Sequence, residues 1–83
     1  MVVKEKLIEL IIKLQNSAIN RKTNQGVSLY TNTLDELNGE ISNDDLFIIH
    51  NNLCTSLSGI NAHGYFNDEE YKYFKKIWQM RKS

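Results

Sequence analysis

Proline is absent from this chain of 83 residues, and cysteine occurs only once, at Cys54. No disulfide can therefore form within the chain, and no residue removes a backbone donor from a helix interior. Only four glycines are present, and they fall between or near the ends of periodic apolar stretches. This punctuation is typical of an all-helical domain.

Net charge is also missing, because ten basic and ten acidic residues cancel. Domains that bind nucleic acid usually carry a basic excess, since phosphate contacts supply much of their affinity. We therefore expect no nucleic-acid partner, and a DNA-binding regulator is a disfavoured alternative. The charge is unevenly distributed: residues 42–70 contain acids but no Lys or Arg, whereas residues 71–83 contain five bases and no acid.

Long hydrophobic runs are lacking as well. No segment reaches the roughly 18 apolar residues of a membrane span, and the N-terminal stretch lacks the features of a signal peptide. A single cysteine also fits a reducing compartment. The sequence thus predicts a cytoplasmic protein without a membrane span, and its length predicts one domain over residues 1–83.

Apolar residues do recur at helical spacing in four stretches, which predict helices at about residues 3–19, 27–38, 43–60 and 68–81. In the first stretch the recurring residues are Val3, Leu7, Leu10, Ile11, Leu14 and Ala18, with Ile8, Ile12 and Ile19 widening the face. The connections are short, so neighbouring helices are expected to be antiparallel. The predicted fold is an all-α, up-down-up-down four-helix bundle with the third helix at its centre.

The last two helices begin with similar capping signals. Ser42 is placed to cap the third helix, and Asn67 with Glu70 has the spacing of a capping box for the fourth. The fourth helix has a predicted apolar face of Tyr71, Phe74, Ile77 and Trp78. Tyr65 and Tyr73 fall outside this face and are expected at the surface.

The residue types that carry catalysis or metal binding are sparse. His50, Cys54 and His63 could suggest a metal site, but a structural zinc site needs four ligands at recognisable spacing. His50 lies four residues before Cys54, yet no third group is placed to orient such a pair. The acidic pairs at the helix starts are explained by capping. We therefore predict a protein that is not an enzyme and has no cofactor or metal.

The basic C-terminal end is the most evident interaction feature. Such a basic end is most often just a solvated helix face, but it could also attract an acidic partner or an anionic membrane surface. The residues predicted to contact a partner are Tyr65, Lys72, Tyr73, Lys75, Lys76, Arg81 and Lys82.

A long first helix, a polar connection, a second helix near SLYTNTLDEL, a third at NDDLFIIHNNLCTSL and a last one in NDEEYKYFKKIW form a recognisable order. Over nearly the whole chain, this order resembles the immunity proteins of pediocin-like (class IIa) bacteriocins, the enterocin A immunity group. The resemblance implies a cytosolic antiparallel four-helix bundle that protects a bacteriocin producer. It would act at the mannose phosphotransferase permease in complex with the bacteriocin.

The resemblance also implies that specificity lies in the C-terminal half, which corresponds to residues 61–81 here. Family members usually have a longer tail after the last helix, so contacts made through such a tail are not expected. A monomer is expected, with peripheral membrane contact left open. The alternative is a small regulatory or adaptor module that binds another protein or dimerises.

Overall fold

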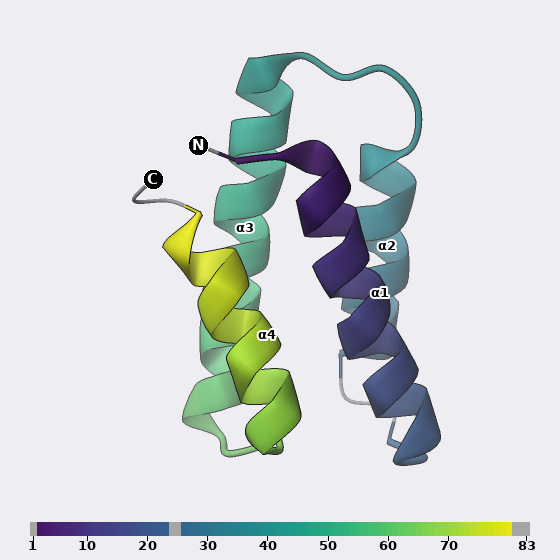
Figure 1. The fold of residues 1–83 in the computed structure, drawn as a ribbon, viewed down its shortest axis with the longest axis vertical. Coiled ribbons are helices and arrows are strands. Elements are labelled where there is room, and N and C mark those ends of the chain that lie inside the picture. The colour runs from purple at the N-terminus through teal and green to yellow at the C-terminus, as the bar shows by residue number, and fades with distance from the viewer. Residues whose placement is uncertain (1, 24–25, 81–83) are drawn as a thin grey trace.

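A computed structural model describes residues 2–23 and 26–80, and within these ranges all regular secondary structure is helical. The helices are α1 (Lys4–Asn20), α2 (Val27–Leu37), α3 (Asn43–Ala62) and α4 (Asp68–Gln79). They run alternately down and up, as Figure 1 shows. The predicted all-α, up-down-up-down four-helix bundle is confirmed. Every described helix boundary lies within two residues of its expected position, because the 3-4 spacing of apolar residues marks the buried stretches.

The helices pack as a ring. Strong contacts join α1 to α2, α2 to α3, α3 to α4 and α4 back to α1, so each helix has two principal neighbours. The expected central position of the third helix is therefore wrong, because α3 and α1 occupy equivalent diagonal places in the ring. The core receives residues from all four helices, and the large fully buried side chains from α1 are Leu7, Leu10, Ile11 and Leu14.

The apolar face of α1 is narrower than its sequence indicates. Ile12 and Ile19 are 41% and 54% exposed, although they extend the periodic face on paper. Ile8 is half-buried against the core. A helix that touches two neighbours in a ring has one side left for water, and these isoleucines lie towards it. No helix in the described part of the chain is long and apolar enough to cross a membrane.

The ends of α3 are fixed by local hydrogen bonds. The Ser42 hydroxyl accepts a bond from the backbone N–H of Asp45 at 3.0 Å, as the sequence predicts for a capping residue. At the other end, Gly64 has a φ of 73°. Its N–H bonds to the Asn61 carbonyl at 2.9 Å, and the N–H of Tyr65 bonds to the Ile60 carbonyl at 3.3 Å. This is a Schellman motif, which stops the helix and turns the chain towards α4.

The turn before α2 contains a close approach between backbone and side chain. Gly26 has a φ of 85°, and a Cβ added there would lie 2.9 Å from the hydroxyl oxygen of Tyr30. Tyr30 is one of the largest fully buried side chains. Only glycine satisfies both the left-handed backbone and the space that the tyrosine occupies.

Candidate partner-binding surface

The start of α4 combines a cap with a buried acid. The Asn67 side chain accepts from the backbone N–H of Glu70 at 2.8 Å, and the Glu70 carboxylate accepts from the N–H of Asn67 at 3.0 Å. The predicted capping box is therefore present. Glu70 is also only 3% exposed, which is unusual for a carboxylate. Such a burial requires a further partner.

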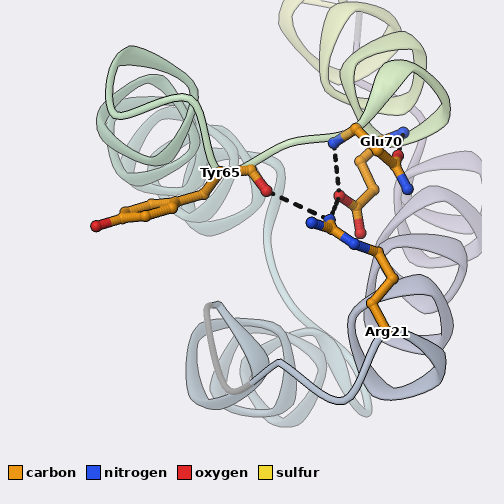
Figure 2. A network of polar contacts seen from close by, with 4 residues as sticks. Arg21, Tyr65 and Glu70 are labelled. Atoms are coloured by element: carbon orange, nitrogen blue, oxygen red, sulfur yellow. Dashed lines mark hydrogen bonds and ion pairs between the residues drawn. The ribbon is translucent and has the colours of Figure 1, made fainter.

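That partner is Arg21, at the C-terminal end of α1. Its guanidinium forms an ion pair with the Glu70 carboxylate and donates a second bond to the Tyr65 carbonyl at 3.3 Å. Figure 2 shows the Tyr65 carbonyl directed at Arg21 while its aromatic ring points away. One arginine thus joins α1 to both the α3–α4 connection and the first turn of α4. The candidate surface on α4 is held in place by this junction.

The charge of Glu70 also affects Tyr30 of α2. Burial of the phenol, together with the nearby Glu70 carboxylate, raises the pKa of Tyr30 to about 12. Residues of α1, α2, α4 and the α3–α4 connection therefore interact at this end of the bundle, the lower end in Figure 1.

The buried face of α4 differs from the predicted one. Glu70, Phe74 and Ile77 are buried, whereas Tyr71 is 42% exposed and Trp78 is half-buried. The prediction that Tyr71 belongs to the core is wrong, and Trp78 lies at the edge of the core. The physical reason is that Glu70, paired with Arg21, takes an inward position that sequence reasoning reserves for apolar residues.

Tyr71 and Trp78 instead border a hollow of about 330 Å³ between α3 and α4. We call it the aromatic groove, and its lining residues are Ser58, Tyr71, Phe74, Lys75, Trp78 and Gln79. The Phe74 ring lies 6.2 Å from Tyr71 and 6.1 Å from Trp78 between centroids. Lys75 holds its ammonium 5.7 Å from the centre of the Tyr71 ring, which is within range of a cation–π contact.

The other predicted contact residues divide between two sides of α4. Lys72 and Lys76 are exposed on the outward side of α4, outside the lining of the groove. Tyr73 turns towards α1, where the Lys13 ammonium lies 5.7 Å from its ring centre. Its hydroxyl donates to Glu69 at 2.7 Å, and this bond, with burial and the Glu69 charge, raises the pKa of Tyr73. Tyr73 is therefore half-buried, and its ring and hydroxyl already have contacts within the chain. It is a weaker candidate for contact with a partner than Lys75.

Tyr65 is 48% exposed, as expected for a surface residue. Its ring stacks on His63 with centroids 5.7 Å apart. Arg81 and Lys82, also predicted to contact a partner, lie outside the described residues. The structure thus brings Lys72, Lys75 and Lys76 together on α4, with Tyr65 near the start of that helix.

A second hollow, of about 350 Å³, lies between α1 and α4 and is lined by polar groups. Its cations already have partners: Lys13 pairs with Glu9 at 3.4 Å, and Arg21 pairs with Glu70. Because these charges are satisfied within the chain, the aromatic groove is the more available surface.

His50 and Cys54 are buried in the core. The imidazole Nε2 of His50 lies 2.7 Å from the Ile77 carbonyl and 3.6 Å from the Cys54 sulfur, so the histidine ties α3 to α4. His63 is on the surface, at the end of α3. Among the described residues, no group of three or more His, Cys, Asp or Glu side chains could hold a metal ion.

Comparison of the chain with protein-family models, with curated protein sequences and with solved structures gave no match.

The sequence analysis did not predict that Tyr71, Trp78 and Ser58 line a groove at the surface. A signal for Tyr71 exists in its spacing: it directly follows Glu70, and adjacent helix positions differ by 100°. Once Glu70 is known to face inward, Tyr71 must lie at the side. Nothing in the sequence marks Ser58, whose role depends on how α3 packs beside α4.

Proposed function

We propose that this protein is a non-enzymatic, cytosolic immunity protein that protects its producer against a class IIa bacteriocin. It acts by binding at the complex of the bacteriocin with the mannose phosphotransferase permease. The proposal combines the family resemblance with the surface of the C-terminal hairpin. The observation that carries it is the aromatic groove, with Lys72, Lys75 and Lys76 on the same helix.

Two physical features support binding at this surface. Aromatic side chains bury a large area at low entropic cost, and they dominate the energetics of many interfaces. Lys75 in the groove, with Lys72 and Lys76 on the same helix, would steer an acidic or anionic surface towards α4. The groove faces outward, between the two helices that make up the C-terminal half.

Rigid attachment of α4 also fits a binding role. The bond from His50 to the Ile77 carbonyl holds one end of the helix, and the Arg21–Glu70 pair holds the other. The groove is therefore preformed, and binding does not have to order it first.

The test is expression of the protein in a bacteriocin-sensitive strain, followed by challenge with a panel of class IIa bacteriocins. We expect protection against at least one member. Lys75→Glu should reduce it, because the reversal places an acid in the groove. Lys6→Glu makes the same charge change at an exposed position of α1 and should leave protection intact. Absence of protection against every member would reject the proposal.

A second candidate function is a small adaptor that binds another intracellular protein. The groove favours it as well, since an apolar groove with lysines fits an acidic amphipathic segment in general. The two candidates separate in the challenge assay: an adaptor would leave sensitivity to all class IIa bacteriocins unchanged.

A further inference from the structure

Three aromatic rings from one helix line the aromatic groove. Tyr71, Phe74 and Trp78 follow one another at helical spacing on α4, so their side chains share one side of that helix. Phe74 is 8% exposed and lies at the inner edge, whereas Tyr71 and Trp78 reach the surface. Successive rings are tilted by 51° and 56°. The rings therefore form a concave aromatic surface and not a flat stack.

The size of the groove limits what it can hold. Its volume of about 330 Å³ lies at the lower end of the range for small-ligand sites, which is roughly 300–1,000 Å³. The occupant is therefore a compact chemical group of a few heavy atoms. Polar side chains border the rings: Ser58 on α3, and Lys75 and Gln79 on α4. These three residues can bind a polar or anionic part of the same ligand.

The rings themselves favour a cation. The face of an aromatic ring has a negative electrostatic potential, which attracts positive charge. The chain already shows this attraction, because the Lys75 ammonium lies 5.7 Å from the centre of the Tyr71 ring. Several rings around one hollow are the usual means by which proteins bind quaternary ammonium groups. Such a group is less strongly hydrated than the ammonium of lysine, so it enters an apolar groove more easily.

Lys75 determines what the rest of the ligand must be. A ligand cation at the Tyr71 ring displaces the Lys75 ammonium and remains close to its charge. Among the described residues, none that lines the groove is acidic. A ligand that carries only a cation is therefore repelled. A ligand with an anion next to its cation is bound instead, because the displaced ammonium pairs with that anion.

The other two lysines of α4 favour a ligand that belongs to a surface. Lys72 and Lys76 are exposed, and neither forms an ion pair among the described residues. A free ligand in the groove would need Lys75 alone. A lipid surface presents many phosphates side by side, and it can occupy all three lysines at once. Tyr and Trp side chains are also favoured at the level of lipid head groups.

We propose that the aromatic groove binds the phosphocholine head group of a membrane lipid. The trimethylammonium group lies against the three rings, and the phosphate pairs with Lys75 and accepts hydrogen bonds from Ser58 and Gln79. Lys72 and Lys76 meet the phosphates of neighbouring lipids. This inference goes beyond the proposed immunity function and does not rest on it.

The fluorescence of Trp78, the only tryptophan in the chain, reports directly on the groove. Titration with free phosphocholine should change it saturably, with a Kd on the order of 1 mM. The control ligand is the carbon analogue of phosphocholine, in which an uncharged tert-butyl group replaces the trimethylammonium group. It should bind about threefold to tenfold more weakly, because the cation–π contribution is lost. No saturable change up to about 20 mM phosphocholine, or equal affinities for the two ligands, would overturn the proposal.

Two substitutions separate the contribution of the rings from that of the lysine. Tyr71→Leu keeps an apolar wall, so it should weaken phosphocholine about threefold to tenfold and leave the carbon analogue unaffected. Lys75→Gln should weaken phosphocholine but strengthen choline, which has no phosphate and no longer competes with an ammonium at the Tyr71 ring. The control Lys72→Gln makes the same charge change outside the groove and should leave both affinities unchanged. Equal effects of the two lysine substitutions would overturn the pairing of Lys75 with phosphate.

Co-sedimentation with phosphatidylcholine vesicles tests the lipid as the source of the head group. Most of the protein should sediment at about 10 mM lipid. Lys72→Gln should reduce the bound fraction, although it leaves the affinity for free phosphocholine unchanged. Binding of free phosphocholine without binding to vesicles would overturn the lipid assignment. The immunity function fails separately: a chain that binds these vesicles but protects no cell in the challenge assay rejects only that function.

Discussion

Substitution of Arg21 and of Glu70 should have unequal effects on stability, although the two residues form one ion pair. Glu70 is 3% exposed, whereas the Arg21 side chain is 40% exposed. Arg21→Met leaves a buried carboxylate without its cation, which typically costs 3–5 kcal/mol. Glu70 still accepts from the N–H of Asn67 and lies in the first turn of α4. These favourable contacts reduce the expected loss to about 2–3 kcal/mol.

Glu70→Gln should be milder. The amide oxygen can keep the bond to the Asn67 N–H, and the exposed guanidinium of Arg21 can be hydrated by water. What is lost is a charge-assisted hydrogen bond, so the expected cost is about 1 kcal/mol. The double variant contains no buried charge. It should therefore be more stable than Arg21→Met alone, which means that Glu70→Gln rescues the arginine substitution.

Urea and thermal unfolding, both followed by circular dichroism, measure these differences. In a domain of this size each kcal/mol shifts Tm by roughly 4–8 °C, so the single variants should be well separated. Lys6→Met is the control, because it breaks an exposed ion pair with Glu9 and should cost no more than about 0.5 kcal/mol. If Arg21→Met were as mild as this control, or if the double variant were the least stable, the reasoning about a buried charge would be refuted.

Four further substitutions test other parts of the fold by the same unfolding measurement. Gly26→Ala should cost about 2–4 kcal/mol, because it adds a clash with Tyr30 to the strain of a positive φ. Gly39→Ala should cost only about 1 kcal/mol, because Gly39 has a φ of 87° but no described atom lies within 4 Å of the added Cβ. Equal losses of stability in the two alanine variants would exclude a clash with Tyr30. The raised pKa of Tyr30 lies above the unfolded value of 10, so the folded chain retains a proton that the unfolded chain releases between pH 10 and 12. The free energy of unfolding should therefore fall by about 2–3 kcal/mol between pH 10 and 12, and this fall should be smaller in Tyr30→Phe. An equal fall in the two proteins would show that Tyr30 is not the group responsible. Lys22 holds a φ of 58° at the end of α1, so Lys22→Gly should stabilise the chain by up to about 1 kcal/mol, and a lower stability would count against strain there.

The fold could be predicted from the sequence because its determinants are local. Leu7, Leu10 and Leu14 recur at helical spacing and are buried as expected. Ser42 and Asn67 cap the helices that follow them, since a capping bond spans only three residues. The place of each helix in the ring could not be predicted, because periodicity gives the width of an apolar face and not its neighbours.

The candidate site was only partly predictable for a related reason. Lys72, Lys75 and Lys76 are exposed as expected, because lysine seldom tolerates burial. Tyr71 was misplaced because its exposure depends on a contact between Glu70 and Arg21, 49 residues apart in the chain. A sequence pattern holds no information on such a pairing, and a buried acid breaks the rule that polar residues mark the outer face.

The buried ion pair and the exposed aromatic groove follow from one rotation of α4. Phe74 and Ile77 lie within roughly 40° of Glu70 around the helix axis, so these three residues face the core together. Tyr71 and Trp78 lie roughly 80–100° away from Glu70 and so are at the edge. If α4 were instead rotated so that Tyr71 faced the core, Glu70 would move towards solvent and the groove would lose its aromatic wall. The Arg21–Glu70 pair therefore does more than join two helices: by making burial of an acid tolerable, it leaves Tyr71 and Trp78 in the wall of the aromatic groove.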